Sequence, residues 1–259
     1  NLLSRFTSQL APDAAVTATA AIHPHVSHRP YVYQFPMGLD SAQPADWALL
    51  DVTTNTDMAP GDVKSTVDAM LAADWGVVDA ADGYLLLQRG AANKEIPPEF
   101  YSFTRRSTAN AAQDALALTG VDALDWPRWR QTRLVTEWTT GPEFEPGQHE
   151  PQFEVVTPAQ QVIATQSTAA PPALVWQPAS AWTRGGEYRI TTLPLSLPRT
   201  VAVRTGSDSA SLAAIFRRVA GDKLVELSPA VAGQHDLPAA LSPGLLAPLQ
   251  DAEATFALP

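Results

Sequence analysis

The sequence predicts an α+β protein of two domains, a small α/β domain followed by an antiparallel β-sandwich. Helix-like and strand-like periods alternate through the first 92 residues. Beyond about residue 110 the helical period largely disappears, and short alternating segments are separated by Pro, Gly and Ser, a pattern typical of sandwiches. Between them, charged residues surround a Pro-Pro pair. We therefore expect domains at residues 1–92 and 111–259, joined by a linker at 93–110.

The first half of the small domain contains one helix and three strands. Leu3, Phe6 and Leu10 recur at helical spacing until Pro12 stops them. The strand candidates follow at residues 15–20, 31–35 and 46–52. The double leucine in the last of these predicts burial on both faces of the sheet.

A second helix and a hairpin complete this domain. Residues 61–76 place apolar side chains on one stripe, and we expect Asp62 to cap the first turn and Gly76 to close the helix. Lys64 and Asp68 can pair one turn apart. Residues 76–90 then predict two strands that meet at the turn dipeptide Asp82-Gly83.

The second domain is predicted from short strand-like segments. Residues 211–220 fit a strand or a helical turn equally well, and residues 228–259 are too rich in Pro, Ala and Leu to assign. The remaining candidates are residues 114–124, 132–140, 151–158, 160–168, 186–195 and 200–206.

Composition excludes several classes of function. A net charge of −10 makes nucleic acid and anionic lipid poor partners, because neither releases counterions to an acidic surface. The absence of cysteine excludes disulfides and thiolate metal sites. No glycine-rich nucleotide-binding motif occurs, and we expect no cofactor. The sequence opens without the pattern of a signal peptide, so we expect a piece of a longer protein.

The run HPHVSHR, residues 23–29, holds the main candidate site. His23, His25 and His28 offer the nitrogen inventory of a zinc site, but no helical His pair or nearby carboxylate supports it, and we favour a structural loop. Ser27 beside His28 is not a catalytic arrangement, because a nucleophile and its base must meet in space. Arg29 could hold a phosphate or carboxylate, although a salt bridge to an aspartate is the stronger expectation.

The first 90 residues resemble the soluble C-terminal part of a family of bacterial polytopic "predicted membrane proteins" of unknown function. The membrane half of that family is similar to lipid-phosphate-sugar-dependent glycosyltransferases. The resemblance rests on PDAAVTA at 12–18, on the run from Pro24 to Pro36, on ADWALLD at 45–51 and on DGYLLLQRG at 82–90. It implies transmembrane helices before Asn1, a place on the extracytoplasmic face of the bacterial membrane, and no catalytic residues in this soluble part.

The second half is similar, more loosely, to a β-sandwich that is appended to bacterial membrane glycosyltransferases. The matching features are RLVTEW at 133–138, and Trp182 to Glu187 followed by a strand and a Leu-Pro pair. Two glycines before Glu187 depart from the family pattern. Sandwiches bind sugars by stacking them on exposed aromatic rings, and the candidates are Trp138, Trp176 and Trp182. Packing in the core is the alternative for most tryptophans of a sandwich, and of the three we expect Trp182 to be exposed.

Three functions remain open at this point. The favoured one is a non-catalytic extracytoplasmic domain that serves the transmembrane portion of the same polypeptide and binds glycan, a lipid-linked sugar or a cell-wall acceptor. The second is a metal- or phosphate-binding hydrolytic enzyme that uses the histidine loop at an end of the sheet. The third is a structural or assembly domain whose sandwich edge pairs with another subunit.

Overall fold

The chain contains both helices and strands, which confirms the α+β class. The computed structural model describes residues 2–54, 58–104, 114–126, 131–157, 159, 161–166, 171–198, 200–205, 212–218 and 224–228. The chain divides into two compact units. Unit 1 comprises Asn1–Arg105 and Pro172–Pro178, and unit 2 comprises Arg106–Pro171 and Ala179–Pro259. Within the described ranges, no helix combines the length and the apolar character needed to cross a membrane.

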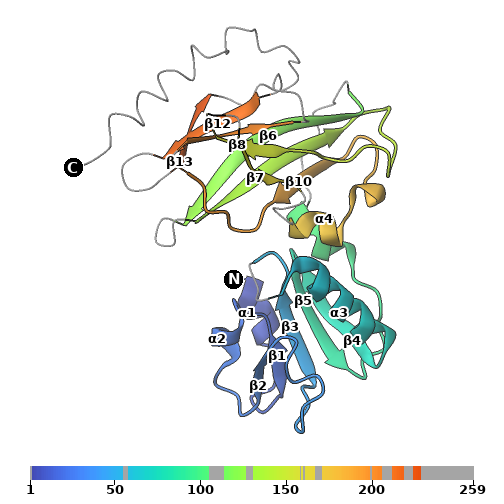
Figure 1. Cartoon of the computed structure of the whole chain (residues 1–259). Coiled ribbons are helices and arrows are strands. Elements are labelled where there is room, and N and C mark those ends of the chain that lie inside the picture. Colours follow the sequence, from blue (N-terminus) through green and yellow to red (C-terminus); the bar gives the residue numbers. More distant parts are fainter. Residues whose placement is uncertain are drawn as a thin grey trace, which may run out of the picture. The chain divides into compact units, whose positions relative to one another are not determined.

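Unit 1 is built on a mixed five-stranded sheet in the order β2-β1-β3-β5-β4 (Figure 1). Strand β1 lies parallel to both β2 and β3, whereas β5 runs antiparallel to its two neighbours, β3 and β4. The strands are β1 (Val16–Ala18), β2 (Val32–Gln34), β3 (Trp47–Asp51), β4 (Trp75–Ala81) and β5 (Tyr84–Arg89). All three strands predicted before residue 60 are therefore present.

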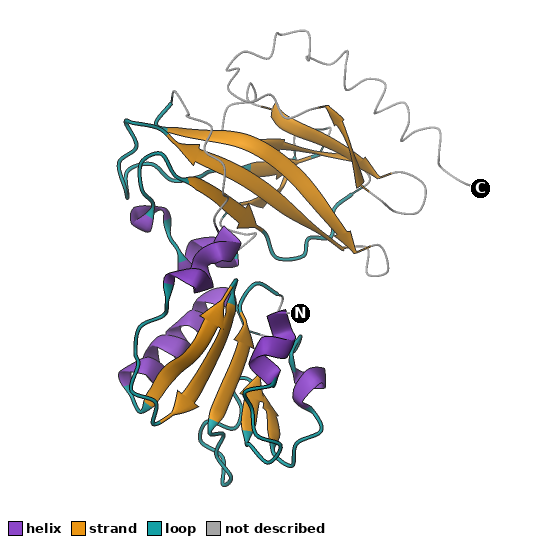
Figure 2. Ribbon diagram, turned by 180° about the vertical axis from the view of Figure 1, so that it is seen from behind, coloured by secondary structure: helices purple, strands orange, loops and turns teal. Residues whose placement is uncertain are grey.

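Helices cover both faces of this sheet (Figure 2). On one face, Leu49 and Leu86 pack under α1 (Leu2–Thr7) and α2 (His23–Val26). On the other face, Leu50 packs with α3 (Pro60–Ala72), the 3₁₀ helix η1 (Pro98–Thr104) and α4 (Pro172–Trp176). Because neighbouring strand residues point to opposite faces, the double leucine of β3 serves both cores, as the sequence predicts.

The β4–β5 hairpin turns at the predicted dipeptide. Asp82 and Gly83 both have positive φ, 48° and 79°, which is the combination required by a two-residue hairpin turn. The preceding helix ends earlier than predicted. Gly76 lies inside β4, and the C-cap of α3 is Ala73. The expected Asp62 cap is also absent, because Ala59 is the N-cap residue and no side chain caps it.

The segment expected to be a linker is folded onto unit 1 in its described part. The ammonium group of Lys94 donates hydrogen bonds to the carbonyls of Ala73 and Trp75. The Val77 amide donates a hydrogen bond to the carbonyl of Asn93. Phe100 of η1 is fully buried. Residues 105–110 of the same segment lie outside the described residues.

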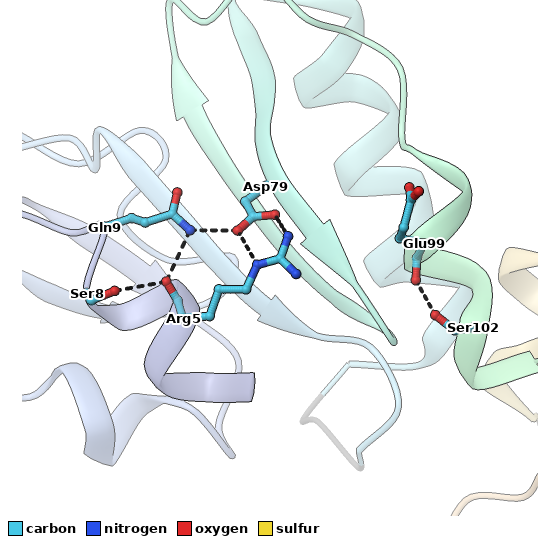
Figure 3. A network of polar contacts seen from close by, with 6 residues as sticks. All are labelled: Arg5, Ser8, Gln9, Asp79, Glu99 and Ser102. Carbon is cyan, nitrogen blue, oxygen red and sulfur yellow. Dashed lines mark hydrogen bonds and ion pairs between the residues drawn. The ribbon is translucent and has the colours of Figure 1, made fainter. Parts of the chain in front are cut away.

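A polar network fastens α1 to β4 (Figure 3). Arg5 pairs with Asp79 through two nitrogens, Nε donating to Oδ2 at 2.9 Å, and Gln9 Nε2 donates to the same oxygen at 2.6 Å. A β-bulge at Val78 shifts the register immediately before Asp79. Burial alone would raise the pKa of Asp79, but the hydrogen bonds from Arg5 and Gln9 and the guanidinium charge outweigh it, so the pKa is lowered.

Unit 2 contains two antiparallel sheets, in the orders β10-β7-β6 and β13-β12-β11-β8-β9. Residues 212–218, which fitted a strand or a helical turn equally well, form the strand β12. The strands are β6 (Leu116–Trp126), β7 (Gln131–Thr140), β8 (Glu154–Val156), β9 (Val162–Thr165), β10 (Glu187–Thr191), β11 (Thr200–Arg204), β12 (Leu212–Arg218) and β13 (Leu224–Ser228). That these sheets form a sandwich stays a prediction.

Candidate functional site

The histidine run forms a short helical turn between two parallel strands. It contains α2 and connects β1 with β2. Ile22 and Val26 are buried in the core under this turn, because their side chains point toward the sheet. His25 and His28 point outward and are exposed, whereas His23 is half-buried. The buried apolar side chains therefore anchor the turn in the core, and the polar side chains of His25 and His28 face the solvent.

Arg29 fixes the end of this turn. Its side chain is only 7% exposed, and it donates from Nε to the carbonyl of Ala11 and from Nη2 to the carbonyl of Leu10, both at 3.0 Å. Its remaining nitrogen, Nη1, lies 3.2 Å from Nε2 of His28. Burial lowers the pKa of Arg29. The expected salt bridge to an aspartate is absent among the described residues, since the partners are backbone carbonyls and an imidazole.

The three histidines of the run are not gathered around one point. No group of three or more His, Cys, Asp or Glu side chains that could hold a metal ion occurs in the described part of the chain, which includes His23, His25 and His28. The hydroxyl of Ser27 donates to the carbonyl of Pro24 at 2.9 Å. Ser27 therefore caps its own turn.

The segment around this turn is free of acidic residues. No Asp or Glu occurs between Asp13 and Asp40, although residues 1–92 contain ten of them. Tyr31, which immediately precedes β2, is 45% exposed. We name the exposed side chains here the α2–β2 surface, which consists of Pro24, His25, Ser27, His28, Pro30 and Tyr31. The lack of acidic residues and the position of Tyr31 could be read from the sequence. The exposure of these side chains could not.

The tryptophans predicted to bind sugar in unit 2 are buried. Trp138 is 4% exposed and donates its indole N–H to Thr136 Oγ1 at 2.9 Å. Trp182, which we expected to be exposed, is only 3% exposed and stacks on Tyr188 with ring centroids 4.0 Å apart and planes within 3°. Phe144 extends the stack beyond Trp182. Trp138 and Trp182 are therefore buried within unit 2 and offer no open ring face to a sugar.

Trp176 is also buried, and it belongs to the other unit. It lies in α4, and its ring meets Phe100 edge-on at 5.1 Å in the core of unit 1. The ammonium of Lys64 lies 5.8 Å from the ring centroid. The sequence assigned Trp176 to the sandwich because nothing local indicates that the chain returns to unit 1 for seven residues.

The strand order places the carboxyl ends of β1 and β3 at a topological switch point, where open α/β sheets commonly bind ligands. The polar groups at this point form hydrogen bonds with one another. Thr19 Oγ1 accepts from the Asp51 amide at 3.0 Å, and Asp51 Oδ1 accepts from the Thr53 amide and hydroxyl at 2.9 and 2.7 Å. Tyr84 also bonds to Asp51, and burial followed by this carboxylate raises the pKa of Tyr84. The histidine run itself leads away from this point toward β2.

Comparison of the chain with protein-family models, with curated proteins and with solved structures gives no match.

Proposed function

We propose that this chain is a non-catalytic extracytoplasmic domain of a membrane glycosyltransferase-like protein, and that it binds glycan or a cell-wall acceptor. In this proposal the transmembrane portion of the same polypeptide performs any sugar transfer, and the domain presents the saccharide to it. The resemblance of the first 90 residues to the soluble part of a family of bacterial membrane proteins suggests the extracytoplasmic location. The α2–β2 surface, rather than the tryptophans, is the binding site that we assign to it.

The observation that carries the proposal is the combination of a fixed backbone with exposed polar side chains on this surface. Ile22 and Val26 lie in the core, and Arg29 bonds to two carbonyls of the segment before β1. A surface that is already ordered loses little conformational entropy when it binds. It offers an aromatic face on Tyr31 and a hydrogen-bonding imidazole on His28, which are groups that suit a sugar ring and its hydroxyls.

The test is titration of the full chain with the trisaccharide of N-acetylglucosamine, followed by amide NMR. We expect the amide signals of residues 24–33 to move, and we expect Tyr31→Ala to weaken binding about tenfold, which corresponds to the loss of one aromatic contact of about 1.4 kcal/mol. Val78→Ala is the control, because Val78 is a 40% exposed side chain of the same unit and lies on β4 rather than beside β2. Saccharide binding that shifts only other residues contradicts the assignment.

One observation favours an assembly role as a second candidate. β9 is an edge strand of its sheet, and it exposes Val162 by 41% and Ile163 by 38% in succession. An uncharged apolar edge can pair with a strand of another subunit. Sedimentation of the full chain tests this role. A dimer that Ile163→Lys converts to a monomer supports it, whereas a monomeric parent chain at high concentration rules it out.

A further inference from the structure

The contact between Arg29 and His28 determines which imidazole nitrogen carries the proton. A guanidinium has only N–H donors and cannot accept a hydrogen bond. Because Nη1 lies 3.2 Å from Nε2 of His28, Nε2 accepts, and the neutral ring must carry its proton on Nδ1. His28 is exposed. The α2–β2 surface therefore presents an imidazole whose second nitrogen is a donor.

The electrostatic environment favours an acceptor that carries negative charge. Arg29 is 7% exposed and has no carboxylate partner among the described residues, so its charge is not neutralised locally. A buried charge is screened less by salt than an exposed one. All ten acidic side chains of residues 1–92 fall outside residues 14–39, the segment that carries this surface. The chain is acidic as a whole, but this part of it has the opposite sign.

We propose that the α2–β2 surface binds a saccharide that bears an oxyanion, either a phosphate ester or a carboxylate. An oxygen of the anion accepts a hydrogen bond from Nδ1–H of His28, and the sugar ring packs against the exposed side chain of Tyr31. Arg29 is a positioning residue, because it fixes the tautomer and supplies the field without touching the ligand. This inference rests on the proposed glycan-binding function and assigns a chemical class to the ligand.

The tautomer is tested first, without any ligand. Long-range ¹H–¹⁵N NMR of the histidine rings in the full chain should show His28 protonated on Nδ1 and bare on Nε2 at neutral pH. Arg29→Met should remove this preference and return His28 to the mixture in which the other tautomer predominates. His25, which has no such partner, is the internal reference. A His28 ring that carries its proton on Nε2 in the parent chain overturns the inference.

The ligand class is tested with four probes: N-acetylglucosamine, N-acetylglucosamine 1-phosphate, N-acetylmuramic acid, which bears a carboxylate, and inorganic phosphate. We expect the sugar phosphate to bind at least about tenfold more tightly than the neutral sugar, as a charge-assisted hydrogen bond implies. His28→Phe should abolish that preference, whereas the matched variant His25→Phe should keep it.

Each failure has a separate meaning. If the neutral trisaccharide binds at this surface and neither the phosphate nor the carboxylate increases the affinity, the ligand class is wrong and the proposed function stands. If inorganic phosphate binds as tightly as the sugar phosphate, the saccharide part of the inference is overturned. If no saccharide binds at all, the proposed function is itself overturned.

Discussion

Replacing Arg29 by methionine is the most informative single change in unit 1. The methionine keeps most of the apolar stem but removes the donors to Leu10 and Ala11, whose carbonyls lie 3.0 Å from the guanidinium. Hydrogen bonds from a charged donor contribute about 1.5–3 kcal/mol each, and the buried charge that disappears offsets part of the loss. We expect the free energy of unfolding of unit 1 to fall by about 2–4 kcal/mol. Arg29→Lys should cost about half as much, because a single ammonium cannot reach both carbonyls in a fork.

Native-state hydrogen exchange on the full chain measures this change without separating the units. The Val16 amide, which donates to the carbonyl of Tyr31 at 3.0 Å, reports on unit 1. The Thr140 amide, which donates to the carbonyl of Gly186 at 3.0 Å, reports on unit 2. Protection should fall at Val16 and stay constant at Thr140. A change at Val16 below about 0.5 kcal/mol, the range of an ordinary surface substitution, would refute the reasoning.

Two further predictions concern the ion pair of unit 1 and the aromatic stack of unit 2. Because the folded pKa of Asp79 is lowered, its stabilisation is present above the unfolded value of about 4 and is lost as pH falls through the folded pKa, so Asp79→Asn should flatten the acid limb of urea unfolding. An unchanged acid limb would count against the ion pair. Trp182→Ala removes a buried ring stacked on Tyr188 and should destabilise unit 2 by about 3–5 kcal/mol, read from exchange of the Thr140 amide. Loss of protection in unit 1 instead would contradict it.

Local rules were sufficient to predict most elements of unit 1. The Asp82-Gly83 turn follows from a backbone requirement, since a two-residue hairpin needs positive φ at both positions and this dipeptide supplies it cheaply. The Lys64–Asp68 pair follows from helical spacing and is present at 2.6 Å. The end of α3 was misplaced because glycine has two uses. Gly76 lies within β4 where a Cβ would collide with the backbone of Ala91, so close packing rather than helix termination requires it.

The candidate site could be located from the sequence but not interpreted. A run of histidines in the sequence indicates possible nitrogen ligands. The partners of Arg29 are backbone carbonyls, and because every residue has a carbonyl, the sequence does not reveal which ones Arg29 binds. The environment of Trp182 was equally hidden. Its neighbours Thr183, Arg184 and the two following glycines suggest a surface loop, but Tyr188 six residues later and Phe144 from another loop enclose the ring. Burial here comes from contacts between loops, which periodicity does not encode.

The contact between Arg29 and His28, on which the proposed anion site rests, also opposes a metal ion. A zinc ion bound at Nε2 of His28 would have to displace the Arg29 nitrogen that lies 3.2 Å away, and it would then sit beside a buried guanidinium. The zinc ion and the guanidinium would repel each other, and residues 14–39 contain no carboxylate that could offset this repulsion. An oxyanion at Nδ1 leaves the Arg29–His28 bond intact and gains from the same charge. An arginine that occupies one ring nitrogen of a histidine, here Nε2 of His28, thus favours an oxyanion over a metal ion as its further partner.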